Sequence, residues 1–319
     1  MTQEITIGKI ITKRGEKIHG CLPVPGTDIN IPITIIHGQS PGKTVVILSG
    51  IHGGEYLGIE VAIRLATSLQ PDKVNGIVIL AHPVNTAAFF ARQQYIHPGD
   101  GKNLNRVFPG KADGTVSEKI AYTITNEMFR QADFVMDLHG GDLHEALEPF
   151  MVFSNSGSGE VDHVSEEAAK LFGIRYLIGL DYSGTTFGTA AQMRIPGFLA
   201  ELGQSGEWSD GEVISYMNGV QHVLKYLEIL DGELEAQKEQ MIRLAGFDTI
   251  KAEETGCWYP SIKPGETIKA GKKIGEIRDF FSNVLHEYHA DQDGIVLVLL
   301  QALAVNAQDP IFAIGRSAI

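Results

Sequence analysis

Residues 50–55 read Gly-Ile-His-Gly-Gly-Glu, and the rest of the chain is best interpreted outward from this stretch. It follows the apolar run 45–48 (Val-Val-Ile-Leu), which is typical of a buried strand, and it precedes residues 56–69, whose apolar positions recur at helical spacing. The stretch is therefore predicted to form a turn between a strand and a helix. In an open α/β sheet, ligands bind in crevices outside the carboxyl ends of strands, so this turn is a candidate site.

His52 and Glu55 lie within this turn, and we predict that both are metal ligands. The two glycines between them let the backbone turn sharply and approach a bound group. Imidazole nitrogen and carboxylate oxygen suit Zn²⁺, and a catalytic zinc takes three protein ligands and leaves a fourth position for water. A hydrogen-bonded turn histidine is the competing interpretation, because His-x-x-Glu pairs are frequent by chance. The zinc hypothesis therefore requires a third ligand elsewhere in the chain.

His139 is the predicted third ligand, because it ends an apolar strand-like run that reads Asp-Leu-His-Gly-Gly at its close. Side chains alternate along a strand, so Asp137 and His139 point to the same side. A metal-bound histidine commonly donates its other ring N–H to a carboxylate, which predicts that Asp137 supports one of the two histidines without showing which. His144, Glu145 and Glu148 follow closely but lie beyond the strand end, and we rank them lower as ligands.

Glu201 is the one carboxylate of the short apolar run 197–203 (Gly-Phe-Leu-Ala-Glu-Leu-Gly). An acidic side chain among apolar neighbours is costly to bury without a purpose. We therefore predict that Glu201 is a general base beside a metal-bound water. A salt-bridge partner is the alternative.

The long connection over residues 86–110 has little periodicity, and connections of this length are usually functional. Its polar residues include Arg92, Asn103, Asn105 and Arg106. A planar guanidinium group suits the bidentate capture of a carboxylate. For either arginine taken alone, a surface position in a loop is the simpler interpretation.

The composition is that of an ordinary globular protein of 319 residues, with 43% hydrophobic and 20% charged residues. A formal net charge of −13 and the lack of a basic stripe argue against a nucleic-acid partner. Cys21 and Cys257 lie far apart, so neither a thiolate zinc site nor a disulfide framework is expected. The N-terminus has no basic region followed by an apolar run, and no apolar stretch of about 18 residues occurs. We expect a cytoplasmic protein without a membrane partner.

Alternating strand-like and helix-like runs predict an α/β domain over residues 1–240, in which residues 1–42 add antiparallel strands. Residues 231–241 are acidic and polar and are interpreted as a helical linker. Over residues 241–319, Gly and Pro punctuate short β-type runs, which predicts a small all-β domain. Its pattern of Gly, Pro and short apolar runs resembles that of the lipoyl/biotinyl-type barrel sandwich. No lysine is placed in a hairpin as attachment of such a carrier group requires, so the resemblance implies the fold and not the attachment.

Four motifs occur in the order Gly-x-His-Gly-Gly-Glu, Leu-Asn-Arg-Val-Phe-Pro-Gly, Asp-Leu-His-Gly-Gly and Glu-Leu-Gly. Together they resemble the succinylglutamate desuccinylase/aspartoacylase family of zinc carboxypeptidase-like enzymes, over roughly residues 40–319. The resemblance implies a mixed sheet flanked by helices and followed by a barrel-sandwich-like domain. One departure is that the Asn-Pro expected after the second strand is His82-Pro83 here. Another is that the spacing from Arg92 to Asn105 is longer than in aspartoacylase.

The resemblance also implies a role for each residue singled out above. It implies that His52, Glu55 and His139 bind one Zn²⁺ per chain and that Glu201 is the general base. It also implies that Asn105 and Arg106 clamp the substrate carboxylate. Arg92 is expected to polarise the scissile carbonyl. The expected reaction is hydrolysis of the amide bond of a small N-acyl amino acid. Segments at 82–85, 101–110 and 279–288 are most similar to the subgroup that deacetylates N-acetyl-diaminobutyrate.

Three other classes stay open on the sequence alone. A metallocarboxypeptidase acting on short peptides would share the metal site and would need an open cleft. A binding protein with a vestigial site is disfavoured because the ligands and the base are all intact, and a carrier module is disfavoured by the missing lysine. The sequence leaves homo-oligomerisation open, and it offers Tyr259 and Tyr288 as tyrosines that could assist the reaction.

Overall fold

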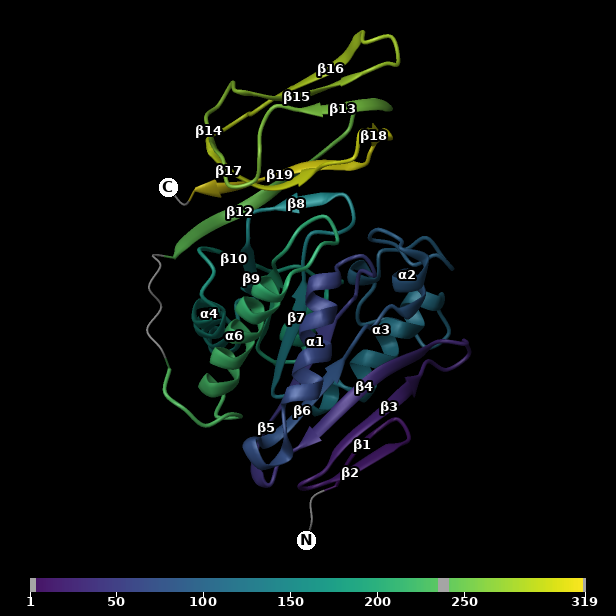
Figure 1. Cartoon of the computed structure of the whole chain (residues 1–319), viewed down its shortest axis with the longest axis vertical. Helices are drawn as coiled ribbons and strands as arrows, with labels where there is room; N and C mark the ends of the chain where they lie inside the picture. The colour runs from purple at the N-terminus through teal and green to yellow at the C-terminus, as the bar shows by residue number, and fades with distance from the viewer. Residues whose placement is uncertain (1–3, 235–240, 318–319) are drawn as a thin grey trace.

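The computed structural model describes residues 4–234 and 241–317 and shows an α/β body with a β-rich region at one end (Figure 1). The predicted helical linker falls largely on residues 235–240, which lie outside the described residues. Residues 231–234, at its start, are not helical. The predicted domain boundary near residue 240 also lies outside the described residues, so the division into two domains stays a prediction.

One mixed sheet runs through the body and into the β-rich region, with thirteen strands among the described residues. From one edge to the other its order is β14 (Thr267–Ile268), β17 (Gly294–Leu300), β19 (Pro310–Ser317), β12 (Ile242–Lys251), β10 (Tyr176–Leu180), β9 (Phe150–Ser154), β11 (Gly197–Glu201), β7 (Phe134–His139), β5 (Ser40–Ser49), β6 (Asn75–Ala81), β4 (Asn30–His37) and β3 (Lys17–Pro23), with β8 (Glu145–Leu147) paired to β17. Strands β6, β5, β7 and β11 are parallel, whereas β4 and β9 run antiparallel to their neighbours in this group. The predicted mixed α/β architecture is confirmed.

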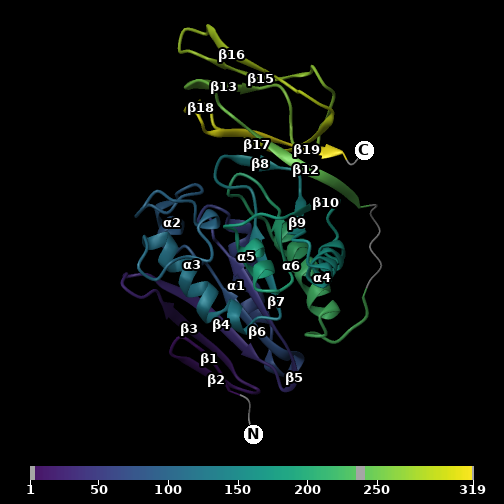
Figure 2. The same ribbon diagram turned by 180° about the vertical axis from the view of Figure 1, so that it is seen from behind.

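Helices cover both faces of the sheet (Figures 1 and 2). One face carries α1 (Tyr56–Ser68), α4 (Gly159–Leu171) and α6 (Asp210–Tyr226), and the other carries α3 (Val116–Glu127) and α5 (Thr186–Gln192). Helix α2 (Thr86–Ala91) follows β6. Three short 3-10 helices are η1 (Pro71–Lys73), η2 (Leu104–Arg106) and η3 (Phe129–Gln131). The predicted helix after residue 55 is α1. Of the helices among the described residues, none has the length and apolar character needed to cross a membrane.

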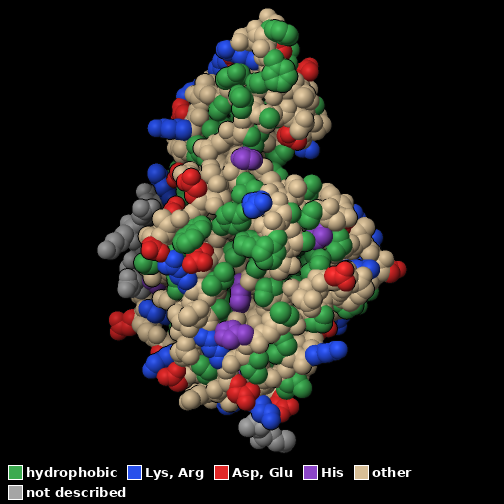
Figure 3. Space-filling view, turned by 45° about the vertical axis from the view of Figure 1, so that its right-hand side comes forward, with side chains coloured by type: hydrophobic (Ala, Val, Ile, Leu, Met, Phe, Trp, Pro, Cys, Tyr) green, Lys and Arg blue, Asp and Glu red, His purple; other side chains and the backbone are tan. Residues whose placement is uncertain are grey.

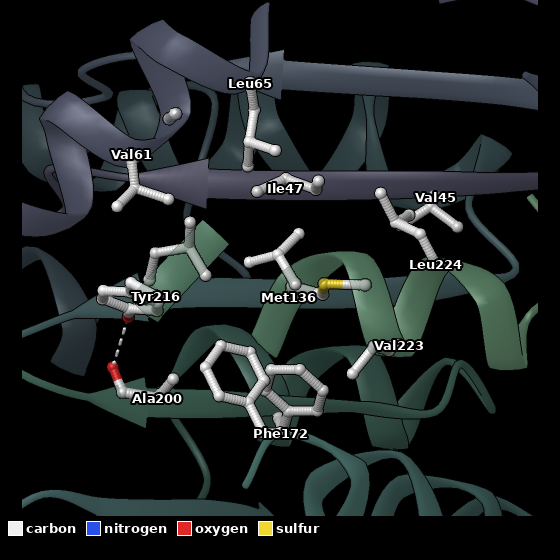
Figure 4. Close-up of a cluster of buried hydrophobic side chains, with 14 of the residues drawn as sticks. Val45, Ile47, Val61, Leu65, Met136, Phe172, Ala200, Tyr216, Val223 and Leu224 are labelled. Carbon is white, nitrogen blue, oxygen red and sulfur yellow. Dashed lines mark hydrogen bonds between the residues drawn. The ribbon is translucent and has the colours of Figure 1, made fainter. Parts of the chain in front are cut away.

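The apolar run of β5 is buried on both sides of the sheet, which explains why it shows no alternation in sequence. Val45 and Ile47 pack toward α1 and α6, where Figure 4 shows Leu65 beside Ile47. Val46 and Leu48 belong to the core on the opposite face. This double burial fixes the register of β5 and therefore the position of the turn that follows it.

The β-rich region adds a second sheet over the end of the first. Its order is β16 (Val284–His289), β15 (Lys273–Arg278), β13 (Gly256–Pro260) and β18 (Ala304–Val305). Trp258 packs between this sheet and the strands of the main sheet, edge-on to Tyr288 and stacked on Phe312. A hairpin of β1 (Glu4–Ile7) and β2 (Ile10–Lys13) closes the N-terminal end, so the predicted antiparallel strands and the predicted β-rich region are both present.

Candidate active site

The candidate site lies where β5, β7 and β11 end side by side. These strands are parallel neighbours, and the register pairs Glu201 of β11 with His139 of β7. On its other side β7 pairs with β5, whose last residues lead directly into the turn at 50–55. The predicted crevice at the carboxyl ends of the strands is therefore the place where the four motifs meet.

The turn itself depends on close packing at Gly53 and Gly54. A Cβ atom on Gly53 would collide with the backbone of Ala88 and Phe89 at α2, and one on Gly54 would collide with the carboxylate of Asp142. Glycine is thus required here because neighbouring segments approach the backbone, and neither residue has a positive φ. The close approach packs α2 and residue 142 against the turn that carries the site.

His52, Glu55 and His139 form one buried cluster, and one potential ligand atom from each lies within 4.8 Å of the others. Glu55 is at its centre: Oε1 lies 2.6 Å from His52 Nδ1, and Oε2 lies 2.9 Å from His139 Nδ1. Burial alone would raise the pKa of Glu55, but the charges of His139 and His52 outweigh it and lower the pKa to about 2. The structure therefore brings together the three residues that the sequence predicts as ligands, with Glu55 as a carboxylate.

The outer nitrogen of each histidine has its own oxygen partner. His139 Nε2 lies 2.9 Å from Asp137 Oδ2, which also accepts the hydroxyl proton of Thr186. His52 Nε2 lies 3.0 Å from Asn103 Oδ1. Asp137 thus serves His139, which the sequence had left open, and Asn103 serves His52. With Nε2 of each ring held by an oxygen atom, Nδ1 of each ring faces Glu55, so both Nδ1 atoms are placed to bind a shared metal ion.

This donor set fits a zinc ion. Glu55 Oε2 is fully buried and has no hydrogen bond of good geometry, although a histidine nitrogen lies 2.9 Å away. A buried carboxylate oxygen without a hydrogen-bond donor is costly unless a cation compensates it. Two imidazole nitrogens and one carboxylate are also a ligand set of catalytic zinc sites.

Helix α6 braces the strand ends from behind. The hydroxyl oxygen of Tyr216 lies 3.0 Å from the carbonyl oxygens of both His139 and Ala200, the latter shown as a dashed line in Figure 4. Tyr216 itself is buried among apolar side chains of that face. One side chain therefore ties together the ends of β7 and β11, which carry His139 and Glu201.

The cluster opens into a cavity of about 340 Å³, with a smaller compartment of about 90 Å³ beside it. Glu201 lines both, and burial raises the pKa of its carboxyl group well above the usual range. The larger cavity lies where the β-rich region meets the body, at the constriction seen in Figure 3. Residues of β12, β17 and β19 form one of its walls, among them Phe247, Val298 and Phe312.

Arg106 and Asn105 both reach the site, in different ways. Arg106 lines both compartments, with its guanidinium carbon 4.9 Å from the ring centre of Tyr182. Asn105 is buried, accepts a hydrogen bond from the Thr186 amide at 2.9 Å and places Nδ2 3.4 Å from His139 Nε2. Their predicted role as a carboxylate clamp stays a prediction, for which Arg106 is the better placed.

Arg92 lies at the exposed end of α2 with a left-handed backbone, φ 50°, and it is not among the residues that line either compartment. Its role at the scissile carbonyl stays a prediction. Tyr259 is 43% exposed and Tyr288 packs in the core of the β-rich region, both away from the cavity lining. Tyr95 lines the larger cavity, with its ring edge-on to His52 at 5.9 Å, and Tyr182 lines the smaller compartment.

Reasoning from the sequence missed the roles of Tyr95, Asn103 and Thr186. Asn103 lies two positions before Asn105, directly before the quoted motif, so its proximity to that motif was an available signal. Nothing local marks Tyr95 or Thr186. Of the lower-ranked ligands, His144 is exposed, and Glu145 lines the cavity without joining the cluster.

Comparison with known proteins decides the family. Residues 41–227 match the family described as the succinylglutamate desuccinylase/aspartoacylase catalytic domain. The chain belongs to the succinylglutamate desuccinylase/aspartoacylase family. It is also 31% identical over 314 residues to the N-alpha-acetyl-L-2,4-diaminobutyric acid deacetylase of Halomonas elongata, covering 93% of this chain and 91% of that protein.

Solved structures of the succinylglutamate desuccinylase/aspartoacylase family agree with this fold over nearly the whole chain. A succinylglutamate desuccinylase from Silicibacter sp. TM1040 has a TM-score of 0.84 at 25% identity, covering 95% of each chain. The ectoine utilization protein EutE (DoeB) from Ruegeria pomeroyi, solved with product bound, has a TM-score of 0.85 at 26% identity, covering 94% of this chain and 95% of that one. The β-rich region is thus included in the similarity.

Proposed function

We propose that this protein is a zinc-dependent hydrolase that cleaves the amide bond of a small N-acyl amino acid carrying a short, neutral acyl group. Family membership indicates a deacylase of N-acyl amino acids. The observation that carries the zinc mechanism is the convergence of His52, Glu55 and His139 on one point, with Glu201 lining the same cavity.

In this proposal His52, Glu55 and His139 hold one Zn²⁺, and Asp137 and Asn103 keep the two rings in the required orientation. A bound zinc ion would act as a Lewis acid that lowers the pKa of water toward neutrality and polarises a carbonyl group. Hydrogen bonds to the outer ring nitrogens are what normally fix such ligands. The chain therefore presents a supported ligand set.

Glu201 takes the part of the proton carrier. It accepts a proton from the attacking water and delivers it to the nitrogen of the leaving amine, because an amide anion is a very poor leaving group. The strand register holds Glu201 beside His139, and Tyr216 holds the two strand ends together. Its raised pKa favours a group that can carry the proton between the two steps.

Arg106 is proposed to bind the α-carboxylate of the amino acid. It is the one lysine or arginine among the described residues that line the two compartments. An acyl group with its own carboxylate, such as succinyl, would need a second cation. The single arginine therefore favours an acetyl or formyl substrate over a succinyl one.

The wall formed by β12, β17 and β19 argues against the competing carboxypeptidase function. A cavity of about 340 Å³ is at the lower end of the range for small-ligand sites, and the β-rich region forms one of its walls. A peptide substrate would need a cleft open along its length. A small amino acid derivative fits the space better.

A hydrolysis screen tests the proposed function. Zinc-loaded protein is incubated with matched N-acetyl, N-formyl and N-succinyl amino acids and with short peptides, and release of the primary amine is measured. We expect turnover of the acetyl or formyl compounds. Turnover confined to peptides would contradict the deacylase, and turnover confined to succinyl compounds would contradict the choice of acyl group.

A further inference from the structure

Thr186, the first residue of α5, is buried next to Asp137, and the proposed function does not use it. Both residues are 0% exposed. The Thr186 hydroxyl donates a hydrogen bond to Asp137 Oδ2 at 2.5 Å, and the same oxygen lies 2.9 Å from His139 Nε2. The three side chains therefore form a continuous series that leads from α5 to a proposed ligand of the metal.

The fold explains why Asp137 depends on α5. Side chains alternate along β7, so Asp137 points to the same face of the sheet as Val135. Helix α5 lies over that face (Figure 2), where Val135 and Ala190 belong to one apolar core. The Asp137 side chain makes both of its hydrogen bonds through Oδ2, and Oδ1 has no hydrogen-bond partner among the described residues. Within the described part of the chain, Thr186 is therefore the only donor besides His139 that holds this carboxylate.

The capping of α5 is done by the neighbouring residue. Thr185 is the N-cap: its hydroxyl accepts a hydrogen bond from the Gly188 amide at 3.2 Å and donates one to the Tyr182 carbonyl at 2.7 Å. The backbone amide of Thr186 has a separate partner, Asn105 Oδ1, at 2.9 Å. The Thr186 hydroxyl is therefore not needed to begin the helix or to hold Asn105, and its one hydrogen bond goes to Asp137.

We propose that Thr186 is a positioning residue for the metal site, because through Asp137 it holds the His139 ring in the orientation that binds zinc. The inference rests on the proposed function and adds a residue to it. A carboxylate held by two donors keeps one orientation, whereas a carboxylate held only by the ring turns with the ring. Loss of such an outer partner typically lowers metal affinity about 10- to 100-fold. Since Thr186 lies one contact further from the metal than Asp137, we expect the lower end of this range.

The competing interpretation is that the Thr186 side chain only packs α5 against the sheet. Thr186→Val removes the hydroxyl and keeps the branched shape, whereas Thr186→Ser keeps the hydroxyl and loses the methyl group. Thr189→Val is the matched control, because Thr189 lies one turn further along α5, is 2% exposed, and has a hydroxyl without a hydrogen-bond partner among the described residues. Together the variants separate the hydrogen bond from the packing. Thr186→Ala, which also lacks the hydroxyl, replaces the valine variant if that protein does not fold.

The test measures the Kd of zinc ions for the metal-free protein, by competition with a chromophoric chelator, and the melting temperature of the same metal-free samples. We expect the Kd to rise about 10-fold in Thr186→Val and to stay within about threefold of the wild-type value in Thr186→Ser and Thr189→Val. A side chain that only packs α5 would instead lower the melting temperature of Thr186→Val and leave its Kd unchanged. That result would overturn the inference.

A double-mutant cycle tests whether Thr186 acts through Asp137. If it does, Thr186→Val changes the Kd of zinc by less than about twofold in an Asp137→Ala protein, because the contact that transmits the effect is already gone. A further rise of about 10-fold in that background would overturn the inference. A wild-type protein that binds no zinc would contradict the proposed function itself, whereas wild-type binding with an equal Kd in Thr186→Val would contradict only the role of Thr186.

Discussion

The α/β body and the β-rich region share one cavity but contribute different things to it. Every charged group of the lining comes from the body: His52, Glu55, Arg106, Glu145 and Glu201, with histidine counted as ionisable. The strands β12, β17 and β19 contribute apolar side chains and one threonine. We propose that the reaction is carried out at the strand ends of the body, whereas the added strands form an apolar wall that limits the size of the substrate.

Glu201→Gln should give the largest change, because it keeps the shape of the side chain and removes the proton carrier. We expect kcat to fall about 10²- to 10⁴-fold while zinc content and substrate binding survive. The exposed Glu207→Gln, six residues along, is the control. A Gln variant with normal kcat and a lower melting temperature would show that Glu201 is a structural ion-pair partner.

Arg106→Lys should lower kcat/KM about 10- to 100-fold, since lysine keeps the positive charge and loses the planar fork that binds a carboxylate. The melting temperature should hardly change, because the Arg106 side chain is exposed. Arg92→Lys, measured beside it, tests the role predicted for Arg92 at the carbonyl. An unchanged kcat/KM in the Arg106 variant would remove this residue from the carboxylate site.

The structure brings the residues that the sequence singled out to one place because they lie at or just after strand ends. His139 and Glu201 are the last residues of β7 and β11, His52 follows the end of β5 by three residues, and parallel strands bring such positions to one edge of a sheet. The partners Asn103 and Thr186 were missed because their contacts depend on the path of the long connection and on α5. These are tertiary features, and no local pattern encodes them.

The β-rich region was predicted as a separate unit, yet its strands β12, β19, β17 and β14 continue the main sheet. Strands can pair with partners that are far away in the sequence. The change in sequence pattern near residue 240, to short β-type runs separated by Gly and Pro, therefore does not mark the end of the main sheet. For the same reason the sequence did not show that Val298 and Phe312 line the cavity.

Val298→Ala should have the smallest effect on the reaction, because Val298 belongs to the wall of the cavity. We expect kcat within about threefold of the original, a KM raised a few-fold, and a loss of about 1 kcal/mol of stability for two partly buried carbon atoms. Steady-state kinetics and thermal unfolding on one preparation test this. A fall in kcat comparable with that of Glu201→Gln would mean that the β-rich region takes part in the chemistry.

The central claim, that the body carries out a zinc-supported hydrolysis, is tested most directly by metal removal and return. The protein is stripped with a chelator, zinc is added back in steps, and amide hydrolysis is measured together with elemental zinc content. The account predicts loss of activity on stripping and recovery that saturates near one zinc per chain. It also predicts that His139→Ala neither retains stoichiometric zinc nor recovers. Full activity in the stripped protein, or one retained zinc in His139→Ala, would contradict the account.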